Sequence, residues 1–297
     1  MAQRIAAMSN HMVNEASPIA DTRLEDGSRV SIVLPPVAIN GPIITIRKFF
    51  NKPITIDRLI ELESITPEAA QFLEKLVKSK YNIFISGGTG SGKTTFLNVL
   101  SDYVPDDERV ITIEDSAELQ LHNINNIVRL EARVANSEGT NAVSIRDLIK
   151  ASLRMRPDRI VVGEVRGPEA IDMLQAMNTG HDGSLSTGHA NSPKDMLTRL
   201  ETMVLMGMDM PVSAIRAQIS SAIDIIVHLA RLRDKSRKVV QIAEVGNCIN
   251  GEIALTPLFK FVENSQDKNG KVIGTLVRQN NVFNRTEKLE AAGFSEW

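Results

Sequence analysis

The sequence predicts an α/β protein with a mainly parallel β-sheet, preceded by a small α+β region. Apolar runs of strand length alternate with amphipathic, helix-like segments from residue 67 to residue 178. A glycine-rich stretch at 87–94 follows one such run and precedes a helix-like segment. Turn residues separate three short strand-like runs before residue 51. Strands that alternate with helices are typical of a parallel sheet covered on both faces.

The segment 1–50 predicts a partial N-terminal domain of one helix and three strands. The helix is expected to end before Pro18, because proline interrupts a helix interior. Asp26-Gly27 separates two of the strand-like runs, and this dipeptide is a strong hairpin signal. The segment 51–66 is interpreted as a linker with one short amphipathic stretch. The three strands are expected at 20–25, 28–34 and 44–50.

The segment 67–297 predicts one larger α/β domain. Thr66 is suited to cap its first helix, and Pro67 is suited to the first helical position. Expected helices lie at 67–80, 93–102, 144–155, 168–178, 193–206 and 211–222. Expected strands lie at 82–86, 109–114, 126–133, 158–164, 224–230, 238–245, 252–259 and 272–278.

The composition is that of a folded soluble protein without a strong charge bias. Hydrophobic residues make up 42% of the 297, and the net charge is −2, which gives no general attraction to nucleic acid or anionic lipid. Aromatic residues make up only 4%, so stacking platforms for single-stranded bases are scarce. Cys248 is the one cysteine, which fits a reducing compartment. We therefore expect a cytoplasmic protein that does not bind nucleic acid directly.

The segment 87–94 fits the phosphate-binding pattern G-x-x-x-x-G-K-[ST] at every fixed position. Its glycines allow a tight turn that aims several backbone N–H groups at one point, and the following helix presents its positive end there. We expect Lys93 to neutralise the β- and γ-phosphates of ATP, and Thr94 to offer its hydroxyl to Mg²⁺. The predicted nucleotide-binding residues are Gly87, Gly88, Thr89, Gly90, Ser91, Gly92, Lys93, Thr94 and Thr95.

Carboxylates end two of the expected strands. Glu164 follows the apolar run RIVVG, and Glu114 and Asp115 end the run ITI. Ligands of such sheets bind at the carboxyl ends of the strands. Glu164 is therefore expected to orient a water molecule or hold Mg²⁺ together with Thr94, and Glu114 is a second candidate catalytic acid. The alternative interpretation of either acid is an exposed side chain at a strand end.

Two of the five histidines, His181 and His189, lie in the glycine- and hydroxyl-rich stretch 178–193. A polar loop and strand of this kind suits a phosphate site. Zinc binding by the two histidines is an alternative, but no cysteine or third histidine lies nearby in the sequence, so it is disfavoured.

Five motifs follow one another in a fixed order: GGTGSGKTT, TIEDSAEL, RLEARVANSEG, LRMRPDRIVVGEVRG and QAMNTGHDGSLSTGHAN. This series resembles the ATPases of the secretion superfamily, and among them the CpaF type, which powers assembly of Tad (Flp) pili. The resemblance covers the chain from about residue 15 onward. It implies a RecA-like ATPase domain, a hexameric ring and inner-membrane platform proteins as partners. CpaF-type proteins carry a longer N-terminal region, so 1–50 would match the second half of an N-domain.

The resemblance also implies roles for particular residues. Glu164 matches the Walker B glutamate, and Glu114 matches the catalytic glutamate of the family. His181 and His189 match a histidine motif that senses the γ-phosphate. Arginines from the N-domain or a neighbouring subunit complete such sites. Arg154 and Arg166 are the predicted catalytic arginines, and the further candidates are Arg23, Arg47, Arg129 and Arg133.

The leading hypothesis is a Mg-dependent ATPase that powers a Tad-type pilus or secretion machine, held at the inner membrane by its partners. A VirB-type conjugation ATPase is a near alternative, because it shares the loop, the acids and the strand that contains Gly-His. A nucleic-acid translocase is disfavoured by the near-neutral charge and the few aromatics. A scaffold that binds ATP without hydrolysing it is disfavoured by the presence of Glu164 and Glu114.

Overall fold

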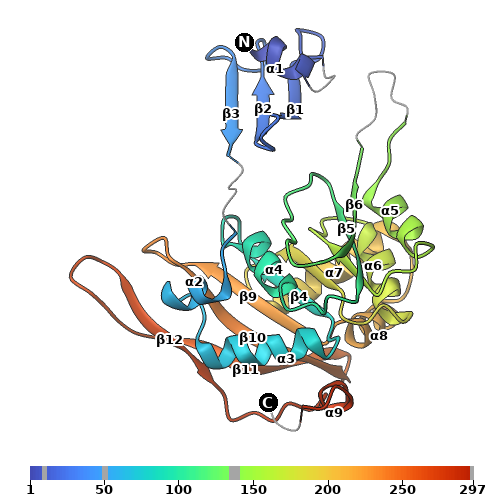
Figure 1. Cartoon of the computed structure of the whole chain (residues 1–297), viewed down its shortest axis with the longest axis vertical. Helices are drawn as coiled ribbons and strands as arrows, with labels where there is room; N and C mark the ends of the chain where they lie inside the picture. Colours follow the sequence, from blue (N-terminus) through green and yellow to red (C-terminus); the bar gives the residue numbers. More distant parts are fainter. Residues whose placement is uncertain (9–11, 49–52, 134–140, 295–297) are drawn as a thin grey trace. The chain divides into compact units, whose positions relative to one another are not determined.

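The computed structural model describes residues 1–8, 12–48, 53–133 and 141–294 (Figure 1). It divides the chain into two compact units, unit 1 (Met1–Pro53) and unit 2 (Ile54–Trp297). The segment predicted to be a linker, 51–66, is divided by this boundary. Its amphipathic stretch forms α2 (Ile56–Glu61), and Leu59 and Ile65 are buried in the core of unit 2. These two apolar side chains explain why residues 54–66 pack onto unit 2.

Unit 1 contains a short helix and a three-stranded antiparallel sheet in the order β1-β2-β3. The Asp26-Gly27 turn is confirmed: Asp26 Oδ1 accepts a hydrogen bond from Ser28 N at 2.9 Å, and Gly27 has a φ of +84°. The predicted helix does not extend to Pro18, since the described residues 12–17 are not helical. The elements are α1 (Ala2–Met8), β1 (Ile19–Arg23), β2 (Arg29–Val33) and β3 (Ile43–Arg47).

Unit 2 is built on a nine-stranded sheet within the described residues, in the order β12-β11-β10-β9-β4-β8-β7-β5-β6. The six strands from β9 to β6 in this order run parallel, which confirms the mainly parallel α/β prediction. Strands β10, β11 and β12 add an antiparallel extension at one edge. The strands are β4 (Ile83–Gly87), β5 (Arg109–Glu114), β6 (Asn126–Glu131), β7 (Arg159–Val162), β8 (Leu185–His189), β9 (Ile225–Arg231), β10 (Arg237–Ile249), β11 (Glu252–Gln266) and β12 (Val272–Arg278).

Helices cover both faces of this sheet (Figure 1). Side chains alternate across a strand, so Ile83 and Ile85 face one core with α3 and α4, whereas Phe84 faces the other core with α5 to α8. This two-sided burial explains why the parallel strands are continuous apolar runs in the sequence. The helices are α3 (Pro67–Lys78), α4 (Lys93–Ser101), α5 (Ile145–Ser152), α6 (Glu169–Asn178), α7 (Pro193–Gly207), α8 (Val212–Ala222) and α9 (Glu287–Ala291).

Local sequence signals account for several helix starts. Thr66 caps α3 as predicted, because its hydroxyl accepts a hydrogen bond from Ala69 N at 3.4 Å. Ser144 caps α5 in a reciprocal capping box with Asp147. These capped N-termini set the first residue of each helix. They thereby determine which residues lie at the carboxyl edge of the sheet.

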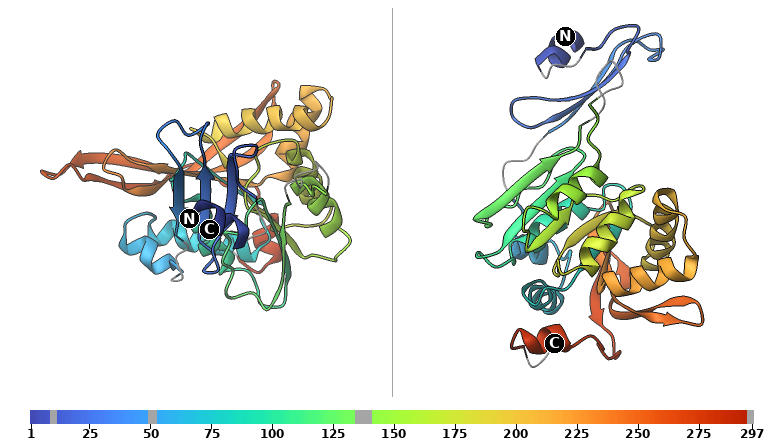
Figure 2. Two further views of the ribbon diagram at one scale, coloured as in Figure 1. Left: turned by 90° about the horizontal axis from the view of Figure 1, so that it is seen from above. Right: turned by 90° about the vertical axis from the view of Figure 1, so that its right-hand side faces the viewer.

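The antiparallel hairpin of β11 and β12 extends beyond the rest of unit 2 in Figure 1 and in the left view of Figure 2. Strands β10 and β11 are longer than the predicted segments 238–245 and 252–259. The far half of β11 is mostly exposed, so it lacks the buried apolar run on which the prediction relied. The strand therefore continues through polar residues that are held by pairing with β12.

The chain after β12 packs against the amino-terminal edge of the sheet, an arrangement that was not predicted. The Tyr81 hydroxyl donates a hydrogen bond to Arg285 O. Lys288 Nζ lies 2.7 Å from Asp182 Oδ1 and 3.0 Å from Asp224 Oδ2. These contacts join the last described helix, α9, to the residues that precede β4, β8 and β9.

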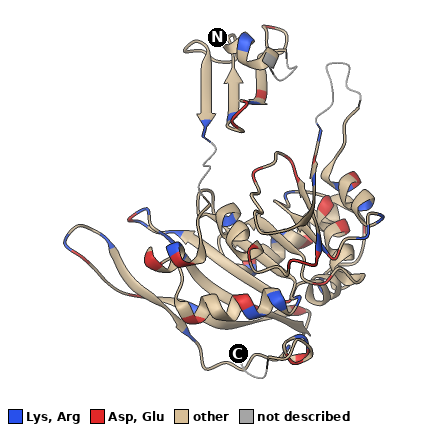
Figure 3. Cartoon of the chain, in the orientation of Figure 1, with Lys and Arg blue, Asp and Glu red and all other residues tan. Residues whose placement is uncertain are grey.

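Acidic and basic residues are mixed along the helices and loops, α3 among them, as the net charge of −2 suggests (Figure 3). None of the helices in the described part of the chain combines the length and the apolar character that a bilayer crossing requires.

Candidate functional site

The predicted phosphate loop connects the end of β4 to the start of α4, as the sequence indicated. Gly92 directly precedes α4 with a φ of +97°, a left-handed conformation that favours glycine because it has no Cβ. Gly88, Thr89 and Gly90 are exposed, and Thr94 and Thr95 are half-buried in the first turn of α4. The loop therefore presents backbone amides and a free helix N-terminus at the carboxyl edge of the sheet.

Lys93 begins α4 and folds back over the loop. Its side chain is buried, and Nζ donates hydrogen bonds to Gly87 O and Gly88 O at 3.2 Å each. Nζ also lies 3.3 Å from His189 Nδ1. Burial lowers the pKa of Lys93, and the charge of Glu164 partly opposes that effect. Within the described residues, the structure gives Lys93 no ion pair with a carboxylate, so this ammonium has carbonyl and imidazole partners only.

Glu164 and His189 meet across two neighbouring strand ends. His189 is the last residue of β8, and Glu164 lies two residues beyond β7. His189 Nε2 is 2.7 Å from Glu164 Oε1. With Lys93 on Nδ1 and a carboxylate beside Nε2, the neutral ring suits both neighbours when its proton is on Nε2. Burial and the Lys93 charge lower the pKa of His189, which favours that neutral form.

Arg166 holds the other carboxylate oxygen of Glu164. Its NH2 group donates to Glu164 Oε2 at 2.6 Å, and its NH1 group lies 3.6 Å from Asp115 Oδ2. Burial alone would raise the pKa of Glu164, but the Arg166 hydrogen bond and the nearby positive charges outweigh it and lower that pKa. Glu164 is therefore ionised at neutral pH. The structure brings this predicted arginine directly to the predicted acid.

Glu114 ends β5, the strand that neighbours β7. Its Oε1 accepts hydrogen bonds from Glu118 N and Leu119 N at 2.9 Å each. Burial raises its pKa to about 7, although these two amides act in the opposite direction. Its side chain lies over Gly163, where an added Cβ would be 2.8 Å from Glu114 Cγ. Glycine at 163 thus leaves the space that Glu114 fills, one residue before Glu164.

The structure does not bring all predicted residues to this edge. His181 precedes β8 and hydrogen-bonds through Nδ1 with Ala176 O at 3.2 Å, so it lies at the opposite end of the strand from His189. That separation also removes the alternative of one zinc ion shared by both histidines within this chain. Arg154 is exposed before β7, at the amino edge. Arg129 and Arg133 are exposed on and after β6, and Arg23 and Arg47 belong to unit 1.

Sequence reasoning missed two residues beside the loop. Arg237, the first residue of β10, donates a hydrogen bond through Nε to Gly90 O at 2.9 Å. His228 on β9 is buried, and its Nδ1 lies 2.7 Å from the Ser86 hydroxyl, directly before the loop. The sequence offered a signal only for His228, as a lone histidine in an apolar run. Arg237 contacts the loop across 147 residues, and no local pattern indicates such a contact.

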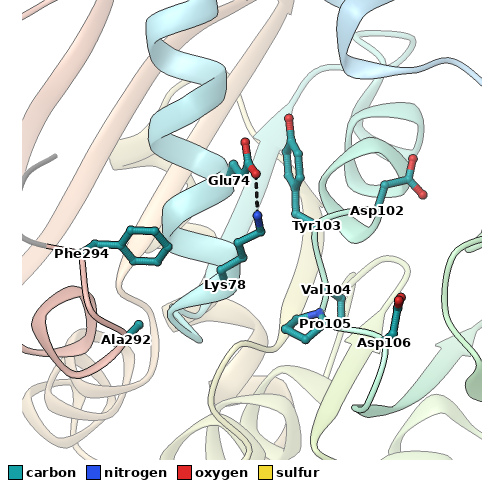
Figure 4. Close-up of a pocket in the computed structure, with 9 residues that line it drawn as sticks. All are labelled: Glu74, Lys78, Asp102, Tyr103, Val104, Pro105, Asp106, Ala292 and Phe294. Carbon is teal, nitrogen blue, oxygen red and sulfur yellow. Dashed lines mark hydrogen bonds and ion pairs between the residues drawn. The ribbon is translucent and has the colours of Figure 1, made fainter.

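A separate pocket of about 620 Å³ lies at the far end of α4 from Lys93 (Figure 4). Glu74 and Lys78 of α3 form an ion pair at its wall, with 2.6 Å between Oε1 and Nζ. Tyr103 lines the same pocket, and burial raises its pKa to about 12. These side chains form no constellation that resembles the group around Lys93, so the carboxyl edge remains the candidate site.

The residues around the loop fit a magnesium–triphosphate ligand. A buried ammonium with no carboxylate partner in the described part of the chain, exposed loop amides and a helix N-terminus all favour a polyanion. Thr94 and Glu164 supply the hydroxyl and carboxylate oxygens that suit Mg²⁺. Glu114, with a pKa near neutrality, suits proton transfer at physiological pH. Together these groups can bind a nucleoside triphosphate and position a water molecule for attack on its terminal phosphate.

Comparison with known proteins agrees with this geometry. A family described as "Type II/IV secretion system protein" matches residues 1–282. A putative conjugal transfer protein of Mycobacterium tuberculosis is 39% identical over 252 residues, which are 82% of this chain and 70% of that protein. The type IV secretion system protein PtlH of Bordetella pertussis is 37% identical over 252 residues, which are 76% of this chain and 74% of that protein.

Solved structures show the same fold. The VirB11 ATPase of the Brucella suis type IV secretion system, in complex with sulphate, is 29% identical with a TM-score of 0.55, covering 82% of this chain and 81% of that one. The pilus retraction motor PilT with bound ADP is 19% identical with a TM-score of 0.55, covering 93% of this chain and 67% of that one. The second likeness concerns the fold alone. The chain belongs to the family of type II/IV secretion system proteins.

Proposed function

We propose that this protein binds Mg-ATP at residues 87–95 and hydrolyses it to drive movement in a secretion or pilus machine. The observation that carries the proposal is the chain of contacts from the loop lysine through His189 to Glu164 at neighbouring strand ends. A loop that served only as a glycine turn would require no buried ammonium and no ionised acid beside it. The relatives named as ATPases support the same activity.

The residues would divide the work as follows. The loop amides and Lys93 bind the phosphates, and Thr94 and Glu164 hold the metal, which supplies charge neutralisation when it is bound. Glu114 accepts a proton from the attacking water through the carboxylate oxygen that faces away from Glu118 N and Leu119 N. His189 keeps Glu164 aligned and lies where the terminal phosphate would meet Lys93. Arg166 neutralises charge at the same acid.

Two observations indicate which kind of secretion or pilus machine the protein would drive. The motif wording supports a CpaF-type Tad pilus motor, in a hexameric ring docked on inner-membrane platform proteins. The named relatives in conjugal transfer and type IV secretion favour a VirB11-like role as the second candidate. Neighbouring genes for prepilins and platform proteins would support the first candidate, whereas mating-pore genes would support the second.

The activity is tested with the purified full chain. We expect phosphate release that requires both ATP and Mg²⁺, and no release from Lys93→Ala at any ATP concentration. The Lys78→Ala variant is the matched control, because Lys78 is exposed on α3 and pairs with Glu74. A folded wild-type protein with no measurable affinity for Mg-ATP would overturn the proposal. Light scattering with a nonhydrolysable ATP analogue tests the ring separately.

A further inference from the structure

Arg237 lies against the phosphate loop from the side opposite the acids. Its Nε donates to Gly90 O at 2.9 Å, and its Cδ lies 3.4 Å from the position that a Cβ of Gly92 would occupy. This is the one side-chain hydrogen bond that the described structure gives Arg237, and it uses only one of the three guanidinium nitrogens. The two terminal nitrogens and the face of the group remain for other partners.

The order of strands gives the loop two different sides. β8, β7 and β5 lie on one side of β4, and they carry His189, Glu164 and Glu114 at or just beyond their ends. β9 and β10 lie on the other side. Lys93 Nζ points to the first side, because it lies 3.3 Å from His189 Nδ1. The terminal phosphate belongs with the hydrolytic groups, which leaves the side of β9 and β10 for the nucleoside end of the same ligand.

Several arginines lie in and beside the turn between β9 and β10, but their side chains have different partners. Arg233 is paired with Glu263, with 2.8 Å between NH1 and Oε2. Arg231 is the register partner of Arg237 across the two strands. Only Arg237, among the described arginines, hydrogen-bonds to a carbonyl of residues 87–94. Its guanidinium is planar, always charged and able to stack on aromatic rings.

We infer that Arg237 forms the nucleoside subsite of this protein: it keeps its Nε on Gly90 and lays its guanidinium face against the ribose and base of the bound nucleotide. The inference rests on the proposed function, since it concerns the ligand of the same loop. The phosphate-binding residues and the acids contact only the triphosphate and the metal. The inference gives the nucleoside a partner in the protein.

A comparison of ATP with a ligand that lacks the nucleoside distinguishes nucleoside binding by Arg237 from structural support of the phosphate loop. Inorganic triphosphate carries the phosphates without ribose or base. We expect Arg237→Ala to weaken Mg-ATP binding about tenfold, in the range of cation–π contacts, while Mg-triphosphate binding changes less than about twofold. Arg237→Gln, which keeps most of the length and a donor for Gly90 O, should show the same selective loss. Arg233→Ala removes a charge from the same turn and should affect neither ligand.

The outcomes discriminate clearly when affinities are measured by calorimetry at fixed magnesium. Equal weakening of ATP and triphosphate by Arg237→Ala would overturn the inference and make Arg237 a support of the loop or a phosphate ligand. Unchanged binding of both ligands would overturn it as well. Wild-type protein that binds neither ligand would instead refute the proposed function. A thermal midpoint within about 2 °C of wild type confirms that each variant is folded.

Discussion

The imidazole of His189 lies between an ammonium and a carboxylate, 3.3 Å from Lys93 Nζ and 2.7 Å from Glu164 Oε1. It thereby connects the phosphate loop on β4 with the acid beyond β7 through one side chain at the end of β8. Because the ring separates the two charges, Lys93 is not neutralised by Glu164 directly. A bound phosphate can approach the ammonium without first breaking an ion pair, which keeps the loop ready for its ligand.

Replacing Glu164 by Gln should slow hydrolysis while sparing binding. The amide keeps the size of the side chain but loses the charge that Arg166 and the metal require. We expect turnover to fall by about 10²–10⁴-fold, the range for loss of a positioned catalytic group, with a change in Mg-ATP affinity of only a few fold. Single-turnover phosphate release and equilibrium binding, measured on the same sample, test this. Equal losses in both would assign Glu164 to binding alone.

Replacing Glu114 by Gln should change stability in a pH-dependent way. The folded-state pKa of Glu114 is raised from 4.5 to about 7, so folding favours its protonated form. The contribution of Glu114 to the free energy of unfolding is therefore fully present below pH 4.5, and it is lost as the pH rises through 7. The variant should be more stable than wild type at pH 8, by up to roughly 3 kcal/mol, and indistinguishable from it near pH 4.5. Urea titrations at both pH values measure the difference.

The same group predicts the pH profile of the wild-type activity. If Glu114 accepts the proton of the attacking water, turnover should rise with pH and reach half its plateau near 7. A profile that is flat from pH 6 to pH 8, with Mg-ATP saturating throughout, would exclude Glu114 as the base. The Asp147→Asn variant serves as a control, since Asp147 is an exposed acid in the capping box of α5.

Replacing Gly163 by Ala should disturb Glu114 through direct contact. The new Cβ would lie 2.8 Å from Glu114 Cγ, so one of the two must move. We expect a loss of about 1–3 kcal/mol in unfolding free energy, as for other overpacked sites, and a fall in turnover. In a Glu114→Ala background the stability loss should nearly vanish, because the clashing carbon is gone. A loss that persists in the double variant would place its cause elsewhere.

Replacing Arg159 by Met should destabilise the fold without touching the nucleotide site. Arg159 is fully buried at the start of β7, and its NH2 group donates to the buried Glu108 at 3.0 Å. Removing the cation leaves a buried, poorly paired carboxylate, which costs about 3–5 kcal/mol. The pair Arg159→Met with Glu108→Leu should recover most of this loss. Chemical denaturation measures stability, and unchanged Mg-ATP affinity of the folded fraction shows that the effect is structural.

Much of unit 2 could be predicted because its strands are buried on both faces. The strand segments IFISG and RIVV form almost continuous apolar runs. The loop at 87–94 matches a phosphate-binding pattern in which each fixed position has a physical explanation. The carboxyl-edge rule then grouped Glu164 and Glu114 correctly. The long hairpin of β11 and β12 was only partly predicted, since its outer half is exposed and its stability comes from pairing.

Residue placement could be predicted only where the strand ends were clear. His181 and His189 looked equivalent in a stretch rich in glycine, yet β8 begins at Leu185 and separates them to opposite edges. Arg154 and Arg166 likewise flank β7, and only Arg166 follows it. Arg237 was missed because its contact with Gly90 depends on the order β10-β9-β4, which local periodicity does not encode.

The contacts of α9 have a consequence for synthesis of the protein. Lys288 pairs with Asp224 and Asp182, and the backbone oxygen of Arg285 accepts a hydrogen bond from the Tyr81 hydroxyl, so residues 285–288 cover positions that are synthesised much earlier. A nascent chain still attached to the ribosome at position 280 lacks these partners, and it leaves Asp224 and the Tyr81 ring uncovered beside β4. The residues that precede β4 and β9 are thus covered only once the chain has emerged beyond residue 288.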